Sequence, residues 1–140
     1  MRPLPVLLLV LAAGIAPARA DTAQTMREAL DRFMPYAGEP VPEIRSYRYY
    51  NWRPLGQEWF ALWTMPNDGV YLVRVELPCR GIDDARSIAI SSTFDVVDAR
   101  TDHVSFGGIT PNRCDIAEIR PVDYRRMKAD DKAAGRPSVR

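Results

Sequence analysis

Residues 58–77, EWFALWTMPNDGVYLVRVEL, decide the fold. They hold two apolar runs separated by a turn that contains Asp68-Gly69, and Asp-Gly between such runs is a strong signal for a β-hairpin with a type I′ turn. In the second run, apolar residues from Tyr71 to Leu77 alternate with Arg74 and Glu76. This alternation predicts an antiparallel strand with one buried face.

Further strands are predicted on both sides of this hairpin. Residues 44–52 form a strand before it, and three shorter strands follow at residues 87–94, 96–106 and 113–119. In the strand at residues 87–94, three apolar side chains are expected on one face: Ile88, Ile90 and Phe94. The predicted domain is therefore mainly β: a curled antiparallel sheet or small barrel of five to six strands, with an N-terminal helix and one disulfide.

Helices are predicted at both ends of the β domain, which spans residues 44–123. Residues 21–43 form an N-terminal helix and a Pro-rich linker, because apolar residues recur there at helical spacing: Met26, Ala29, Leu30, Phe33 and Met34. Pro35 ends this helix. Residues 124–140 form a basic tail, helical around residues 124–134 and frayed beyond them.

Residues 1–20 have the three-part pattern of a secretory signal peptide. Arg2 gives a positive start, residues 4–15 are an apolar run, and Ala18-Arg19-Ala20 is a small-x-small cleavage signature before Asp21. A transmembrane anchor is the alternative, but this run is shorter than the ~20 residues that cross a bilayer as a helix. The mature protein is thus expected in the periplasm or secreted, without a transmembrane anchor.

Charge and composition narrow the function classes of this 140-residue chain. Loss of Arg2 and Arg19 with the signal peptide changes the formal net charge from +1 to −1, which argues against a nucleic-acid binder. A local basic surplus remains near the C-terminus, in Arg120, Arg125, Arg126, Lys128, Lys132, Arg136 and Arg140. Such a tail is either a solvated chain end or a contact for an anionic partner.

Cys79 and Cys114 are the only cysteines, and both follow the predicted signal peptide. An even number of cysteines in an exported chain predicts a structural disulfide. A reactive thiol pair is the alternative, but the spacing is not C-x-x-C and His103 is the only histidine that could serve as a base.

Most of the aromatic side chains fall within residues 47–71. They form either a cross-strand ladder in the core or a patch that binds a ligand. The candidate binding aromatics are Tyr47, Tyr49, Tyr50, Trp52, Trp59 and Trp63. Tyr49 and Tyr50 point to opposite faces if both lie in one strand, so some members of this set belong to a second face.

No motif for catalysis, cofactor binding or metal binding stands out. Asp102-His103 is the only carboxylate–histidine neighbour pair, and adjacent strand residues point apart. The sequence therefore predicts no cofactor, no metal site and no catalytic residue.

Several short motifs carry a resemblance to a known family. They are Trp52-Arg-Pro-Leu, Leu62-Trp-Thr-Met-Pro, Val70-Tyr-Leu-Val-Arg-Val, Asp102-His-Val, Cys114-Asp-Ile and Ile119-Arg-Pro-Val-Asp. Together, over roughly residues 45–128, they resemble a family of small exported proteobacterial proteins of unknown function, in which two cysteines bracket a β-rich segment. The resemblance implies an envelope or secreted location, and it implies no activity and no functional residues.

The leading functional hypothesis is a non-enzymatic periplasmic domain that binds through an aromatic face or a sheet edge. Its partner is an envelope protein or a glycan. Two alternatives remain open: a small envelope hydrolase with a carboxylate-based site, and a structural or inhibitory partner of an envelope protein.

The signal-peptide interpretation predicts that the mature protein begins at Asp21. N-terminal sequencing and intact mass of the exported protein measure this directly. A mature chain that retains residues 1–20 would contradict the prediction.

Overall fold

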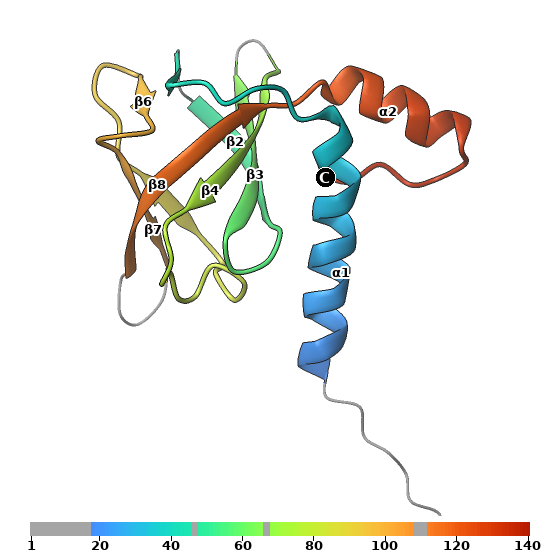
Figure 1. The fold of residues 1–140 in the computed structure, drawn as a ribbon, viewed down its shortest axis with the longest axis horizontal. Coiled ribbons are helices and arrows are strands. Elements are labelled where there is room, and N and C mark those ends of the chain that lie inside the picture. Colours follow the sequence, from blue (N-terminus) through green and yellow to red (C-terminus); the bar gives the residue numbers. More distant parts are fainter. Residues whose placement is uncertain (1–17, 46–47, 66–67, 108–111) are drawn as a thin grey trace, which may run out of the picture.

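The computed structural model describes residues 18–45, 48–65, 68–107 and 112–140. Most of the predicted signal peptide, residues 1–17, lies outside the described residues. The main feature is a six-stranded antiparallel sheet that curls into a half-barrel (Figure 1). Its strands in spatial order are β2 (Arg48–Pro54), β3 (Trp59–Met65), β4 (Val70–Val75), β8 (Asn112–Pro121), β7 (His103–Phe106) and β5 (Ile88–Ile90). The predicted fold class is confirmed.

Two short strands and two helices complete the described fold. Strands β1 (Glu43–Ile44) and β6 (Val97–Asp98) pair with each other and place Ile44 and Val97 in the core. Helix α1 (Ala18–Phe33) continues into a 3₁₀ turn at Met34–Tyr36, and helix α2 is Tyr124–Ala133. Pro35 ends α1 at Phe33, as predicted, since proline disfavours helical backbone in the residue before it. Neither described helix is long and apolar enough to cross a membrane.

The sheet is buried on both faces at its centre. Side chains on the inner face fill the half-barrel, and those from β3 and β4 are Phe60, Leu62, Val73 and Val75. On the outer face, Ala61, Trp63, Val70 and Leu72 pack under the helices. The prediction that β4 buries one face was therefore wrong, because α1 and α2 cover the side that a solitary hairpin would leave in water.

Trp63 holds the outer core together. Its ring makes edge-to-face contacts with Phe33 of α1 and Tyr124 of α2, at centroid distances of 6.0 and 5.8 Å. Such pairs contribute about 0.5–1.5 kcal/mol beyond the area that they bury. Trp63 thus joins both helices to the sheet.

The C-terminal residues pack against the fold and are not frayed. Val139 is buried, and its carbonyl oxygen accepts a hydrogen bond from the Tyr124 hydroxyl at 2.8 Å. The buried Asp131 of α2 lies within ion-pair distance of Arg32 (2.8 Å) and Arg136 (3.2 Å). These contacts fix the end of the chain to α1 and α2.

The predicted strand at residues 96–106 is two strands, β6 and β7, separated by a turn. The carboxylate of Asp102 stabilises this turn by accepting the Asp98 backbone N–H (2.7 Å) and the Ser91 hydroxyl (2.5 Å). The preceding strand, β5, is also shorter than predicted. Phe94 lies in a turn beyond it and is 96% exposed, so its predicted place on the face of Ile88 was wrong.

The turn between β3 and β4 differs from the predicted two-residue type I′ turn. Strand pairing ends at Trp63 and Val70, and the Thr64 N–H donates to the Gly69 carbonyl at 2.8 Å. Asp68 has a φ of 48°, but Gly69 does not adopt a positive φ. Gly69 is required for space: a Cβ there would lie 2.8 Å from the Thr64 Oγ1 and 3.0 Å from a Tyr71 ring carbon.

Substitution Gly69→Ala is therefore expected to destabilise the protein by crowding, at about 1–3 kcal/mol. Thermal or urea unfolding measures the loss. The combination with Thr64→Ala removes the nearest contact and should recover part of the stability that Gly69→Ala alone loses. An unchanged melting temperature for Gly69→Ala would show that the turn has the space after all.

Candidate functional site

Two hollows open at the end of the half-barrel that carries the β3–β4 turn, which we call the turn end. The first, the β6 hollow, has a volume of about 970 Å³ and is lined by Glu43, Arg45, Arg48, Met65, Asp68, Phe94, Asp95 and Val96. The second, the α2 hollow, has a volume of about 600 Å³ and is lined by Tyr50, Asp68, Gly69, Val70, Val122, Asp123, Tyr124, Arg125, Lys128 and Arg140. Asp68 lines both, so the turn itself separates them.

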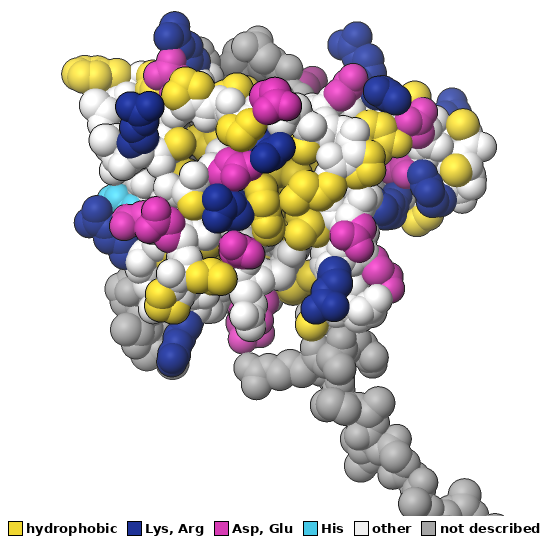
Figure 2. Space-filling model, in the orientation of Figure 1, with side chains coloured by type: hydrophobic (Ala, Val, Ile, Leu, Met, Phe, Trp, Pro, Cys, Tyr) yellow, Lys and Arg dark blue, Asp and Glu magenta, His cyan; other side chains and the backbone are white. Residues whose placement is uncertain are grey.

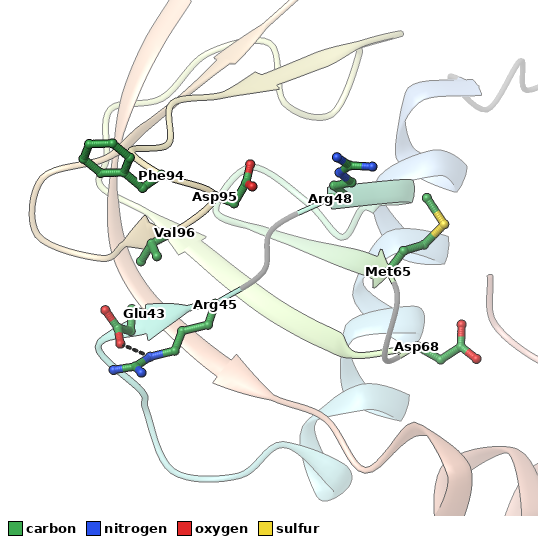
Figure 3. A pocket seen from close by; sticks show the side chains of 8 residues that line it. All are labelled: Glu43, Arg45, Arg48, Met65, Asp68, Phe94, Asp95 and Val96. Atoms are coloured by element: carbon green, nitrogen blue, oxygen red, sulfur yellow. Dashed lines mark hydrogen bonds and ion pairs between the residues drawn. The ribbon is translucent and has the colours of Figure 1, made fainter.

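The β6 hollow combines charges of both signs with exposed apolar side chains (Figure 3). Arg45 donates to Glu43 at 2.5 Å and neutralises it. Met65 is 44% exposed on the other side of the hollow from Phe94. Beside this pair, the described lining carries one further cation, Arg48, and two further acids, Asp68 and Asp95, with an apolar residue on each side.

Phe94 lies at the tip of a two-residue hairpin. Thr93 and Val96 exchange both backbone hydrogen bonds, at 3.0 and 3.1 Å, and Phe94 and Asp95 have φ values of 53° and 58°. Two positive φ values are typical of a type I′ turn, where Asn-Gly is preferred. A bulky residue such as Phe in this conformation is strained by about 1 kcal/mol or more.

The α2 hollow holds three cations beside the two acids Asp68 and Asp123. Arg125, Lys128 and Arg140 are all exposed, and none of them forms an ion pair with a carboxylate of the described residues. The Lys128 Nζ lies 5.1 Å from the centre of the Tyr124 ring. Asp123, the nearest acid in the sequence, is the N-cap of α2 and accepts the Arg126 backbone N–H at 3.1 Å.

Three other arginines around α2, unlike those of the α2 hollow, form ion pairs with carboxylates. Arg32 and Arg136 flank the buried Asp131, and Arg126 lies 4.0 Å from Asp130. Tyr36 also donates to Asp130 at 2.8 Å; this hydrogen bond, burial and the charge of Asp130 raise the pKa of its hydroxyl. The fold therefore separates the paired basic residues from those that face the α2 hollow.

The structure distributes the candidate aromatics between the core and the surface. Trp63 is buried beneath the helices, and Trp52 packs on the inner core at 6.4 Å from the Phe106 ring. Tyr49 packs on the same core and donates to the Ile88 carbonyl at 2.8 Å, which links the edge strands β2 and β5. Tyr47 lies outside the described residues.

Tyr50 and Trp59 retain more accessible surface. The pairing of β2 with β3 skips Tyr50 at a bulge between Tyr49 and Asn51, and Tyr50 is 49% exposed in the α2 hollow. Trp59 is partly buried and lies under the guanidinium of Arg74, 5.9 Å from the ring centre. The structure therefore does not gather the five described aromatics into one patch.

Hydrophobic side chains gather near the middle of the face shown in Figure 2, with charged side chains of both signs around them. One charged cluster joins strands β4 and β8. Arg74 contacts both Glu118 (3.3 Å) and Glu58 (3.7 Å), and Arg120 also contacts Glu118. Burial alone would raise the pKa of Glu118, but hydrogen bonds from Arg120 and Arg74 outweigh it and lower that pKa. This cluster is neutralised internally, unlike the α2 hollow.

Ser91, Asp102 and His103 lie together but do not form a catalytic triad. Ser91 donates its hydroxyl proton to Asp102 and accepts the His103 backbone N–H at 2.9 Å, so the imidazole ring takes no part. Among the described residues, no group of three His, Cys, Asp or Glu side chains is placed to hold a metal ion.

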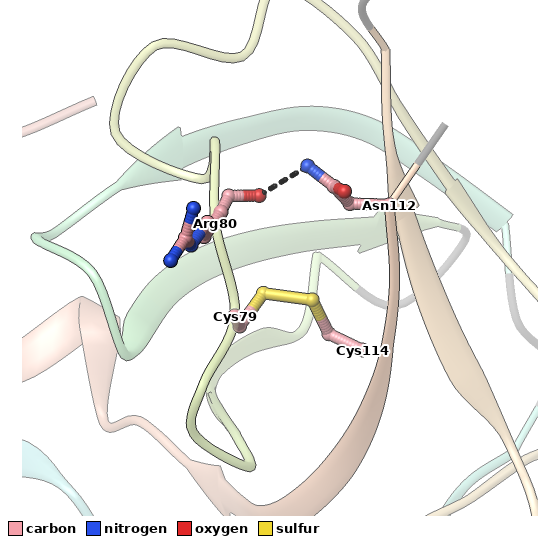
Figure 4. The surroundings of a disulfide bond; sticks show 4 residues. All are labelled: Cys79, Arg80, Asn112 and Cys114. Atoms are coloured by element: carbon pink, nitrogen blue, oxygen red, sulfur yellow. Dashed lines mark hydrogen bonds between the residues drawn. A yellow bond between two sulfur atoms is a disulfide. The ribbon is translucent and has the colours of Figure 1, made fainter. Parts of the chain in front are cut away.

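Cys79 and Cys114 form a disulfide, with their Cα atoms 5.6 Å apart (Figure 4). Both residues are buried, at 6% and 4% exposure. Beside them, the Asn112 side chain donates to the Arg80 carbonyl at 2.7 Å. The bridge ties the segment after β4 to the beginning of β8.

Sequence reasoning missed the gathering of residues at the turn end. It singled out Tyr50 among the aromatics and Arg125, Lys128 and Arg140 in the basic tail, but it did not bring these two sets together. Phe94 was expected in a strand. The structure shows that Phe94 and Asp95 are the two central residues of a tight turn between Thr93 and Val96. Sequence reasoning missed this turn because it lacks the glycine that usually marks one.

Comparison with known proteins identifies a family for this chain. The family model described as "Family of unknown function (DUF6491)" matches residues 1–138. No curated protein and no solved structure matches the chain significantly.

The disulfide predicts the effect of removing both cysteines. The change Cys79→Ala with Cys114→Ala should lower the free energy of unfolding by about 2–4 kcal/mol, because the unfolded chain regains the entropy of the closed loop. Urea unfolding of the oxidised protein and of the double variant measures this difference. Rapid alkylation of a cysteine in the native protein near neutral pH would contradict the structural role and indicate a reactive thiol.

Proposed function

Because this chain belongs to the DUF6491 family, whose function is unknown, we propose a function from its own residues: it is an exported, non-enzymatic binding domain that holds an anionic saccharide in the α2 hollow. The observation that supports this most is the group of cations there. Arg125, Lys128 and Arg140 share one hollow, and none of them forms an ion pair with a carboxylate of the described residues, although Asp68 and Asp123 also line it.

Like charges brought together repel one another, and an anionic ligand relieves that repulsion. Near these three cations, Arg32, Arg126 and Arg136 do pair with carboxylates of α2. Asp123 is engaged as the helix cap, so its carboxylate already accepts a backbone hydrogen bond. The surface next to the cations is thus suited to sulfate, phosphate or carboxylate groups.

Tyr50 adds a surface for the sugar ring. Its side chain is about half exposed and lines the same hollow as the cations. Aromatic faces stack on the apolar faces of sugars, and the tyrosine hydroxyl remains free for hydrogen bonding at the rim. A saccharide that carries acidic groups uses both features at once.

Export is part of this proposal. A disulfide is typical of an oxidising compartment, and it is compatible with the signal-peptide pattern at residues 1–20. The location is therefore the periplasm or the medium, where acidic glycans of the envelope are accessible.

The hydrolase alternative receives no specific support. Asp68 and Asp95 line the same hollow, but both are exposed, and Figure 3 shows them apart on different turns. Glycoside hydrolysis needs two carboxyl groups at a set separation on opposite sides of the bond. The binding role uses the described geometry more directly.

Dextran sulfate and neutral dextran of equal length test the proposal, with affinity measured by isothermal titration calorimetry. The protein is expected to bind dextran sulfate, with weaker binding as salt rises, and not neutral dextran. Changing Arg125, Lys128 and Arg140 to Gln should raise the dissociation constant roughly tenfold or more, since each exposed charge contact contributes about 0.5–1 kcal/mol.

A matched variant controls for the change in net charge. Arg80→Gln, Arg86→Gln and Arg100→Gln remove the same number of exposed charges away from the α2 hollow and should leave the affinity unchanged. Tyr50→Ala should weaken binding, whereas Tyr50→Phe retains the ring and most of the affinity. Equal loss of affinity in both triple variants would reject a site in the α2 hollow.

A further inference from the structure

The side chain of Phe94 belongs to neither hydrophobic core of the described residues. Its aromatic ring is 96% exposed and its backbone has a positive φ of 53°. In Figure 3 the ring points away from the other side chains of the β6 hollow, so Phe94 does not fill the hollow beside it. An exposed ring on a strained backbone lowers the stability of the monomer, which suggests a role outside it.

The hairpin is also held firmly in place. Reciprocal backbone bonds between Thr93 and Val96 close it, and Val97 directly after it is buried in the core. The Asp102 carboxylate fixes the next turn through the Asp98 backbone N–H. Phe94 is therefore presented by a rigid element, and little conformational freedom is lost when it binds.

We propose that a second copy of this chain receives Phe94 in its β6 hollow, so that two copies form a symmetric dimer. In each copy the protruding ring and the hollow lie side by side, as a two-fold interface requires when one surface must contact itself. Phe94 of one copy contacts the exposed Met65 of the other. The partner copy thus completes the lining of the hollow.

Charge complementarity supports a second copy as the occupant. Asp95 is adjacent to Phe94 at the hairpin tip, and Arg48 lines the hollow that would receive it. Within the described residues, neither of these two side chains has an ion-pair partner in its own chain. In the dimer, Asp95 of one copy reaches Arg48 of the other, and the symmetry makes this pair twice.

A membrane surface fits the hairpin less well. An aromatic tip inserts into lipid most readily beside cations, whereas Asp95 would be carried into the headgroups of anionic lipids with Phe94. In the dimer both Phe94 and Asp95 make favourable contacts, whereas in lipid insertion only Phe94 would.

Sedimentation velocity and light scattering of the exported protein over a range of concentrations test the dimer. The protein is expected to dimerise, and Phe94→Ser should raise the dimer dissociation constant roughly tenfold or more, as for a buried aromatic at an interface centre. Leu77→Ser is the matched control, because Leu77 is also exposed (58%) but lies outside the β6 hollow. It should leave the dimer unchanged.

Charge exchange gives a second, independent measurement. Arg48→Asp and Asp95→Arg should each weaken the dimer, and the two changes in one chain should restore it. At protein concentrations below the dimer dissociation constant, Phe94→Gly should raise the melting temperature of the monomer, because glycine relieves the strain of the positive φ.

Three outcomes would overturn the proposal. The first is a protein that remains monomeric at all accessible concentrations. The second is a Phe94→Ser variant that dimerises as well as the parent protein. The third is a monomer that binds vesicles of anionic phospholipid through Phe94. The dimer and the saccharide site are tested separately, since Phe94 and Arg48 lie outside the α2 hollow and the cations of that hollow lie outside the dimer contact.

Discussion

The burial of strand β3 on both faces is the constraint on which the rest of the structure depends. Phe60 and Leu62 face the interior of the half-barrel, while Ala61 and Trp63 face the helices, and all four are almost fully inaccessible. A central strand of this kind needs cover on two sides. The curled sheet provides one cover, and α1 with α2 provides the other.

This constraint determines where the molecule remains open. The helices pack on the outer face of the sheet, where Phe33 and Tyr124 contact Trp63. The inner face is filled, and the Tyr49 hydroxyl links the two edge strands at Ile88. Among the described residues, the helices leave the end of the half-barrel around Asp68 open, and there β6, the β3–β4 turn and α2 form the two hollows.

The sequence predicted the parts of this fold that depend on local pattern. The hairpin around Asp68-Gly69, the disulfide and the end of α1 at Pro35 follow from periodicity, cysteine count and backbone chemistry. The second buried face of β4 did not, because Val70 and Leu72 are buried only by helices that are distant in the chain. The break at Asp102 and the grouping of Tyr50 with Arg125 depend on tertiary contacts that no local window contains.

The shared position of Asp68 connects the two proposed interactions physically. Asp68 lies on the turn that separates the hollows, and its positive φ of 48° shows that the surrounding turn holds the backbone in an uncommon conformation. A second copy seated in the β6 hollow contacts one side of this turn, and a saccharide in the α2 hollow contacts the other. In a symmetric dimer the α2 hollows also occur in pairs, which favours a polymeric ligand with repeated acidic groups over an isolated anion.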